Sequence, residues 1–376
     1  MTTPNFFQIA NSELTQDGFI QWLLEWANPQ YAEFDGKLHI AALAFVRLLL
    51  LPDNNTEDIC VSSVECEAQK NNIDILALIK DDVNQKKYAV IIEDKTDTTV
   101  HDNQLVRYSM DVKERYNEWE LHCVYFKTGN ESNYSLDKIE RDYKKNNWVI
   151  TNKPIFKMVL REDVLKVLGS FSPQNVIYSD FVNNLDRIQR WTKSYKNEGK
   201  IVNEWGNTAW QGYYMGLEGL LGRGAWRCGQ GDPIINKKGI KVSAWEFALP
   251  MLPIMEDDSI QLYLQLGLRK LSIKAQCASS TNPKKSLKNA MAHIKIDMAE
   301  YIERTNLKLE EIKNIHTGKD ITIFNIKREV EGETKQFIGL NYTYAELSYV
   351  VPQLLELYEK LKDISDILKR ESIEGV

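Results

Sequence analysis

The sequence predicts a mixed α/β fold over the first half of the chain and an α+β fold over the second half. Three closely spaced strand-like runs between residues 58 and 95, then a helix and two more strand-like runs, predict a mixed sheet in the first half. Alternating runs after residue 260 predict antiparallel strands in the second half. A chain of 376 residues, 43% hydrophobic and 27% charged, is long enough for two globular domains with buried cores.

Two helices are expected at the start of the chain. In "TQDGFIQWLLEWA", Thr15 or Asp17 can cap the first helix, and apolar residues from Phe19 to Trp26 follow at helical spacing. A second amphipathic helix is expected over about residues 38–50.

The predicted sheet begins with the runs "DICVSSVECEA", "NIDILALIK" and "KYAVIIEDK". Their short polar connectors predict an antiparallel meander. A helix over about residues 102–116 separates the third strand from "LHCVYFK", so we expect this fourth strand to run parallel to the third. Another strand around "WVITNKPIFKM" and a long helix over about residues 175–195 complete the first half.

The polar segment "KSYKNEGKIVNEWGN", with Gly199 and Gly206, predicts the boundary between a domain of residues 1–198 and a domain of residues 199–376. The second domain opens with an aromatic-rich helix, continues with the strand-like runs "IQLYLQL" and "LSIKAQC", and contains two more helices. These helices are expected near residues 286–304 and 352–370. We interpret this α+β part as an accessory domain for substrate binding, regulation or oligomerisation.

The last predicted helix carries Leu354, Leu361 and Leu368, which are spaced by seven residues. This spacing fits a seam with a second copy or a partner protein, and it fits equally a single helix packing on its own domain.

Charge and cysteine content exclude several classes of protein. A formal net charge of −6 argues against a surface coated in positive charge for non-specific nucleic-acid binding, although a local basic groove is compatible with it. The five cysteines are scattered and the histidines show no ligand spacing, so a disulfide framework or a zinc site is not expected. The first ten residues lack the features of a signal peptide, and the apolar run of residues 40–51 is too short to span a bilayer. We therefore expect a soluble cytoplasmic protein.

Three charged residues fall where two neighbouring strands meet. Asp74 lies at the start of the second strand, and Glu93 and Lys95 lie at the end of the third. If these strands form a hairpin, Asp74 comes within reach of the other two, while Glu93 and Lys95 point to the same face, about 7 Å apart at ~3.3 Å rise per residue. Two carboxylates suit a hard cation such as Mg²⁺, which can activate water and neutralise phosphate charge, and the lysine can assist. An isolated Glu-x-Lys pair on a strand is also a common surface feature worth about 0–1 kcal/mol.

Three further polar residues are candidates for the same site. Gln104 and Tyr108 share a face of the helix that follows Lys95, and Glu13 precedes the first long apolar helix.

The series Asp74, then Glu93-Asp94-Lys95, then Gln104-x-x-x-Tyr108 resembles the motifs of the PD-(D/E)XK nuclease superfamily, and the Gln-x-x-x-Tyr element resembles its RecB-like branch. The segments "SELTQDGFIQWLLEWA" and "DGKLHIAALAFVRLLL" are similar to the opening helices of a bacterial family within it. Ile73 stands where the motif name has proline. The resemblance covers about residues 10–195 and implies a restriction-endonuclease-like αβββαβ core.

By this resemblance, each candidate has an expected role. Asp74 and Glu93 bind Mg²⁺ or Mn²⁺ with the backbone carbonyl of Asp94, and Glu13 supports the metal. Lys95 is the catalytic lysine, and the Gln-x-x-x-Tyr pair orients the lysine or the DNA backbone.

The function expected from these residues is Mg²⁺-dependent hydrolysis of phosphodiester bonds, with DNA as the expected substrate and genome maintenance or defence against foreign DNA as the setting. One alternative is a non-catalytic module that keeps the fold to bind nucleic acid or a partner protein. Another is a nuclease held inactive until a partner or signal triggers it.

Overall fold

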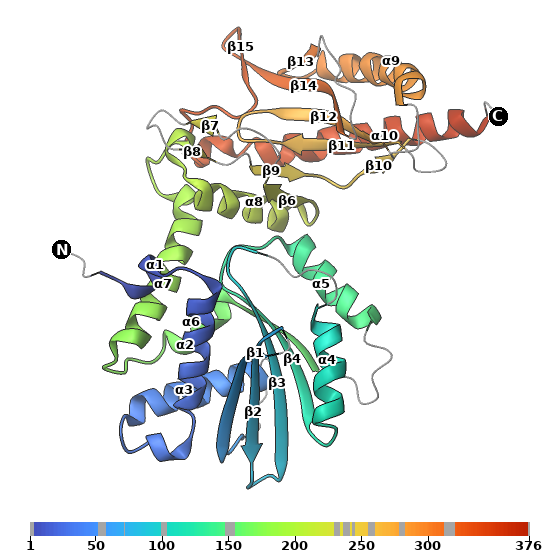
Figure 1. Ribbon diagram of the computed structural model, residues 1–376. Coiled ribbons are helices and arrows are strands. Elements are labelled where there is room, and N and C mark those ends of the chain that lie inside the picture. Colours follow the sequence, from blue (N-terminus) through green and yellow to red (C-terminus); the bar gives the residue numbers. More distant parts are fainter. Residues whose placement is uncertain are drawn as a thin grey trace. The chain divides into compact units, whose positions relative to one another are not determined.

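The computed structural model describes residues 4–51, 58–70, 72–98, 104–146, 155–228, 234–235, 241–242, 245–254, 260–277, 283–311 and 320–374 (Figure 1). The chain forms two compact units. The first contains residues 1–131 and 135–191, and the second contains residues 132–134 and 192–376. In the described residues, no helix is both long and apolar enough to cross a membrane.

The first unit contains a five-stranded mixed sheet with strand order β1-β2-β3-β4-β5. The strands are β1 (Ser63–Lys70), β2 (Ile73–Asp81), β3 (Lys86–Lys95), β4 (Glu120–Lys127) and β5 (Ile155–Leu160). β1, β2 and β3 form an antiparallel meander, and β3, β4 and β5 are parallel. The predicted meander and the predicted parallel fourth strand are both present.

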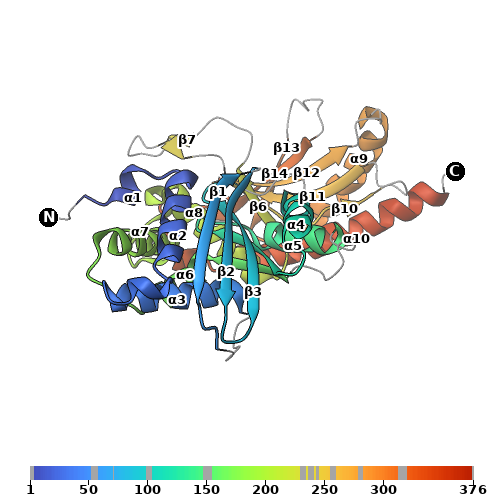
Figure 2. The same ribbon diagram turned by 60° about the horizontal axis from the view of Figure 1, so that its bottom comes forward.

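Helices cover both faces of this sheet (Figure 2). They are α1 (Phe6–Ile9), α2 (Glu13–Glu25), α3 (Gly36–Leu50), α4 (Gln104–Arg115), α5 (Asn133–Asn146), α6 (Arg161–Leu168) and α7 (Val176–Lys193). Alternate side chains of β3 enter two different cores, because neighbouring residues of a strand point to opposite faces. Val90 and Ile92 pack with α2, α3, α6 and α7, whereas Ala89 and Ile91 pack with α4 and with Tyr143 of α5.

The first long helix begins earlier than predicted. Its N-cap is Ser12, whose side chain accepts a hydrogen bond from the backbone N–H of Thr15. The prediction that Thr15 or Asp17 caps this helix is therefore wrong. Asp17 is instead buried inside the unit.

Three phenylalanines fasten the chain start to α7. Phe19 of α2 stacks on Phe181 of α7 with ring centroids 3.7 Å apart. Phe7 of α1 meets both rings edge-on, at 5.6 Å and 5.3 Å. The helix that opens the fold is thus packed against one that ends about 170 residues later.

The second unit contains an eight-stranded sheet whose main path is β13-β14-β12-β11-β9-β6. Its strands are β6 (Ala225–Cys228), β9 (Trp245–Ala248), β10 (Leu252–Pro253), β11 (Ile260–Leu266), β12 (Leu271–Cys277), β13 (Leu307–Glu311), β14 (Asp320–Val330) and β15 (Glu333–Gln336). All pairings in it are antiparallel. β7 (Ile234–Ile235) and β8 (Lys241–Val242) form a separate pair.

One face of the eight-stranded sheet packs on α8 (Asn207–Leu221), α9 (Pro283–Ile302) and α10 (Val350–Glu374). Leu354, Leu361 and Leu368 of α10 are all buried in this core. Their spacing therefore serves packing of α10 on its own unit.

Some expected elements lie partly outside the described residues. The first two residues of the helix predicted from residue 102, and residues 148–154 of the strand predicted around 148–158, are among these. Two helices of the first unit, α5 and α6, were not predicted from the sequence at all.

Candidate functional site

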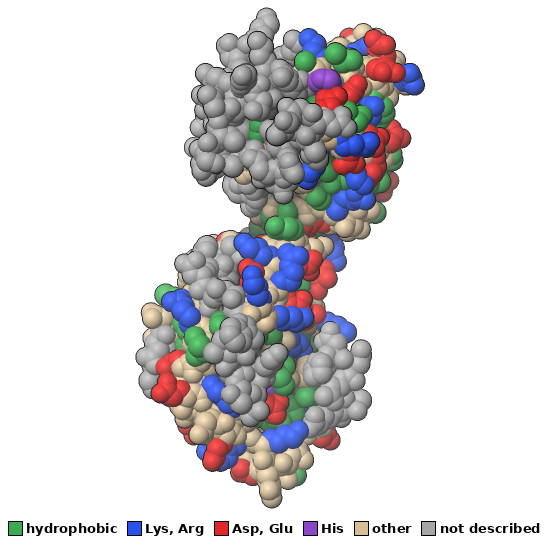
Figure 3. All heavy atoms as spheres, turned by 90° about the vertical axis from the view of Figure 1, so that its right-hand side faces the viewer, with side chains coloured by type: hydrophobic (Ala, Val, Ile, Leu, Met, Phe, Trp, Pro, Cys, Tyr) green, Lys and Arg blue, Asp and Glu red, His purple; other side chains and the backbone are tan. Residues whose placement is uncertain are grey.

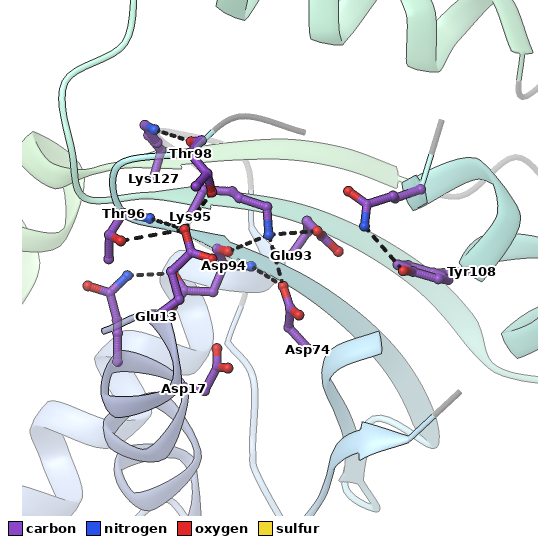
Figure 4. Close-up of polar contacts among 12 residues, drawn as sticks. Glu13, Asp17, Asp74, Glu93, Asp94, Lys95, Thr96, Thr98, Tyr108 and Lys127 are labelled. Atoms are coloured by element: carbon purple, nitrogen blue, oxygen red, sulfur yellow. Dashed lines mark hydrogen bonds and ion pairs between the residues drawn. The ribbon is translucent and has the colours of Figure 1, made fainter. Parts of the chain in front are cut away.

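The paired ends of β2 and β3 bring Asp74, Glu93 and Lys95 together (Figure 4). The Lys95 Nζ lies 2.8 Å from Glu93 Oε1 and 3.3 Å from Asp74 Oδ2, and it donates a hydrogen bond of 2.7 Å to the carbonyl of Asp94. Asp74 Oδ2 also accepts a hydrogen bond of 3.1 Å from the backbone N–H of Asp94. The ammonium is therefore held by two carboxylates and one carbonyl.

Burial strongly affects the charge state of these groups. Glu93 is 1% exposed, and burial together with the negative charge of Asp74 raises the pKa of its carboxyl to about 7. Burial alone would lower the pKa of the Lys95 amine, but its hydrogen bond to Glu93 and the nearby carboxylates raise that pKa well above its usual value. Lys95 is therefore an ammonium ion at every physiological pH.

The Asp94 side chain points to the opposite face of β3, toward α2. It accepts a hydrogen bond from the Gln16 amide and shares a hydrogen bond with the carboxyl of Asp17. Thr128 donates to Gln16 Oε1 at 2.7 Å, and Gln69 donates to Asp17 Oδ2 at 3.1 Å. Burial and the charge of Asp74 raise the pKa of Asp17 to about 6. Burial, with the charges of Asp17 and Asp74, raises the pKa of Asp94 well above its usual value. One proton shared between the carboxyls of Asp17 and Asp94 accounts for the raised pKa of each group.

Glu13, the first residue of α2, holds the segment that follows Lys95. Its Oε1 accepts hydrogen bonds from the backbone N–H of Thr96 at 3.1 Å and from the Thr98 hydroxyl at 2.6 Å. Burial of Glu13 opposes ionisation, but these hydrogen bonds and the charges of Lys95 and Lys127 outweigh it and lower its pKa. Glu13 is thus an ionised anchor beside the site, in contact with backbone and hydroxyl groups.

A second lysine holds the same segment from the other side. Lys127 ends β4 directly beside Lys95 in the parallel register, and it is 1% exposed. Its Nζ donates to the carbonyl of Thr98 at 2.5 Å and lies 3.4 Å from Glu131 Oε2. Residues 96–98 are therefore fixed by α2 and by β4.

Gly129 allows the loop after β4 to approach that segment closely. A Cβ atom at this position would lie 1.8 Å from the carbonyl oxygen of Thr96, which no side chain tolerates. The backbone N–H of Thr128 also donates to the carbonyl of Lys95 at 3.2 Å. Any larger residue at position 129 would push the end of β3 away.

Gln104 and Tyr108 lie together on α4, with Gln104 Nε2 donating to the Tyr108 hydroxyl at 3.4 Å. Tyr108 is 7% exposed and points toward Glu93 (Figure 4). Burial and the charges of Glu93 and Asp74 raise its pKa. In the part of the chain that the structure describes, no hydrogen bond joins Tyr108 to Lys95.

Sequence reasoning missed Asp17, Lys127 and Gly129. Asp17 lies four residues after Glu13, so helical spacing places both on one face of α2. Lys127 ends the strand next to Lys95, so the predicted parallel pairing already contained this signal. Gly129 carried no signal, because its requirement comes from a carbonyl about 30 residues away.

The donor set at the strand ends fits a hard divalent cation, although no cluster of three or more His, Cys, Asp or Glu side chains among the described residues is arranged to hold one. All candidate ligand atoms are oxygens, namely the two carboxylates of Asp74 and Glu93 and the carbonyl of Asp94. Glu93 Oε2 is buried and has no hydrogen-bond partner among the described residues. A buried carboxylate oxygen without a donor is a group that a cation would satisfy.

Comparison with known proteins gives one result. A family model described as the PD-(D/E)XK nuclease superfamily matches residues 4–171. The searches of curated proteins and of solved structures returned no match. The matched segment contains the ends of β2 and β3 with Asp74, Glu93 and Lys95, and residues 4–171 of this chain belong to the PD-(D/E)XK nuclease superfamily.

Proposed function

We propose that this protein is a nuclease that uses Mg²⁺ or Mn²⁺ to hydrolyse phosphodiester bonds of DNA. Membership of the superfamily indicates nuclease activity, and PD-(D/E)XK nucleases generally use divalent metal ions. The element order α2, α3, β1, β2, β3, α4, β4 supports the assignment of a restriction-endonuclease-like αβββαβ core. The Gln104-x-x-x-Tyr108 pair on α4 supports a place in the RecB-like branch.

The observation that carries the proposal is the position of the Lys95 ammonium between two carboxylates at the end of a rigid, buried strand pair. Asp74, Glu93 and the Asp94 carbonyl would hold the metal ion. A bound divalent ion supplies activation of water and neutralisation of phosphate charge.

The chain's own residues supply position and charge. Lys95 remains protonated, so its expected role is to bind a phosphate oxygen and stabilise the extra negative charge of the transition state. Glu13 and Lys127 keep the segment after Lys95 in place, and a displacement of about 1 Å at a reacting group can cost about 100-fold in rate. Tyr108, with Gln104, closes the α4 side of the site.

One observation favours a triggered nuclease as the second candidate. In this structure Lys95 occupies the space between the two carboxylates, so a metal ion and the ammonium compete for the same oxygens. A substrate phosphate or a partner that draws Lys95 away would then complete the site. In this view the second unit serves as the accessory domain, which regulates the first or helps it to bind substrate.

A cleavage assay tests the proposal. Wild type, Lys95→Ala and Asp74→Asn are incubated with supercoiled plasmid, linear duplex DNA and single-stranded DNA, each with Mg²⁺, Mn²⁺ or EDTA. Cutting that needs metal and is lost in both variants supports the proposal. Equal cutting by wild type and Lys95→Ala refutes the site assignment.

The same set of proteins and substrates distinguishes a triggered nuclease from a non-catalytic binding module. Tight nucleic-acid binding without cutting, unaffected by Lys95→Ala, indicates the non-catalytic module. Cutting that appears only after cell extract is added, and only with an intact Lys95, indicates the triggered nuclease.

A further inference from the structure

The helix α5 carries a row of positive charge on its outward face. Lys138, Arg141 and Lys145 follow one another at i, i+3 and i+7 and are all exposed. The opposite face of α5 places Leu136, Ile139 and Tyr143 against the core next to α4. Packing of that face fixes the rotation of the helix, so the three cations are held facing solvent.

These three cations have no ion-pair partner in the described part of the chain. None of them has an ion pair or hydrogen bond with another residue in the described ranges, and the ion pair of α5 joins Lys144 to Glu140 instead. Asp137 and Asp142 border the row at four-residue spacing from Arg141 and Lys138, but no ion pair joins either carboxylate to the row in the described residues.

The row belongs to the same structural block as the candidate site. α5 begins six residues after Lys127, which ends β4 beside Lys95. It also packs on α4, where the hydroxyl of Ser109 lies 3.4 Å from that of Tyr143. Figure 3 shows Lys and Arg side chains gathered on the surface of this unit on the side where α4 and α5 lie in Figure 1.

The spacing of the row matches a phosphate backbone. Seven residues of α-helix rise about 10 Å. One strand of a duplex carries a phosphate about every 3.4 Å along its axis, so about three phosphates face a row of this length. Three flexible cations on a rigid helix fit such a polyanion without reading its sequence.

We propose that Lys138, Arg141 and Lys145 of α5 form a nucleic-acid backbone contact that holds the substrate strand beside the strand ends bearing Asp74, Glu93 and Lys95. This inference rests on the proposed nuclease function and names a binding surface that the function alone does not assign. The contact is electrostatic and independent of base sequence.

The experiment measures binding apart from cutting. Full-length protein in EDTA is titrated against fluorescein-labelled 20-mers of duplex DNA, single-stranded DNA and single-stranded RNA, at several salt concentrations between about 50 and 200 mM. The test variant combines Lys138→Gln, Arg141→Gln and Lys145→Gln. The matched control combines Lys37→Gln, Lys87→Gln and Lys166→Gln, which removes the same charge from exposed lysines elsewhere in the first unit.

The expected result is a change in salt dependence. Loss of three phosphate contacts makes the negative slope of log K against log salt shallower, by about 2.7 for duplex and about 2.1 for single strands. It also weakens binding at least tenfold near ~0.1 M salt. The control keeps the wild-type slope within about 0.5. A charge-preserving variant that combines Lys138→Arg, Arg141→Lys and Lys145→Arg keeps the wild-type slope. The nucleic acid that shows the largest slope identifies the preferred backbone.

Three results would overturn the inference. A wild-type slope in the test variant, with cutting intact, rejects the surface and leaves the nuclease function standing. An equal loss in the control variant shows that only total charge matters, which also rejects the surface. Wild-type protein that binds no nucleic acid at any salt concentration rejects the surface together with the proposed function. The single variants Lys138→Gln and Arg141→Gln, each expected to lower the slope by about 0.9, repeat the test if the triple variant folds poorly.

Discussion

Replacing Asp17 by asparagine should stabilise the first unit at neutral pH and change its stability little near pH 4. Asp17 is 3% exposed, and its carboxyl shares a hydrogen bond with that of Asp94. Above its pKa the folded protein must hold the ionised carboxylate of Asp17 in a buried site, close to the negative charge of Asp74. Asparagine has nearly the same shape, can accept the hydrogen bond from Gln69, and can donate to Asp94.

The magnitude follows from the shift in pKa. Burial and the negative charge of Asp74 raise the pKa of Asp17 from 3.8 to about 6 in the folded protein. At 1.36 kcal/mol per unit this amounts to about 3 kcal/mol. Because the folded-state pKa lies above the unfolded-state value, wild-type stability falls as pH rises from about 4 to about 6, and the penalty is fully present above that range.

The assay is urea unfolding of full-length wild type and Asp17→Asn at about pH 7.5 and pH 4, followed by tryptophan fluorescence. We expect a gain of about 2–3 kcal/mol at the higher pH and about 0.5 kcal/mol or less at the lower one. The control is Asp186→Asn, which removes a half-exposed carboxylate of α7 paired with Arg190 and should change stability by less than about 0.5 kcal/mol at either pH. A loss of stability in Asp17→Asn at pH 7.5, or an equal effect at both pH values, would refute the shared-proton explanation.

Two further predictions concern the end of β3. Gly129→Ala should destabilise the protein by about 1–3 kcal/mol and reduce cleavage, since the added methyl group would displace Thr96, whereas Gly18→Ala, with open space around its Cβ, should be neutral or stabilising by up to about 1 kcal/mol. Unfolding curves and cleavage rates of the two variants check this, and equal behaviour would contradict it. Mn²⁺ affinity should increase with pH through about 7 and binding at pH 6 should release protons, because Glu93 must ionise to act as a ligand. Calorimetry in two buffers of different ionisation heat measures both the affinity and the proton release, with Asp74→Asn as the non-binding control. A Mn²⁺ affinity that does not change between pH 6 and 8 would contradict the prediction.

Much of the first unit was predictable because its signals are local. The apolar sequences of β2 and β3, joined by a short connector, predict a hairpin. The hairpin in turn predicts that Asp74 lies close to Glu93 and Lys95. The intervening helix α4 predicts the parallel pairing of β4. Each of these inferences needs only neighbouring parts of the chain.

The missed elements have weak or distant signals. α5 is mostly polar, and only Leu136, Ile139 and Tyr143 mark its buried face. The cap of α2 was misplaced because Asp17 is a good capping residue by type, whereas its actual partners, Asp94 and Gln69, lie far away in the sequence. Most strands of the second unit are short or are surrounded by sequence in which apolar and polar residues do not clearly alternate.

The stack of Phe7, Phe19 and Phe181 has a practical consequence for dividing the chain. The family match ends at residue 171, before α7 begins at Val176. A fragment cut at residue 171 would leave two aromatic rings on α1 and α2 facing water, and an uncovered aromatic patch promotes aggregation. The helix that loses its cover is the one that starts with Glu13. Any shorter form of this protein intended for crystallisation should therefore retain α7 in full, even though α7 contributes no residue to the strand ends.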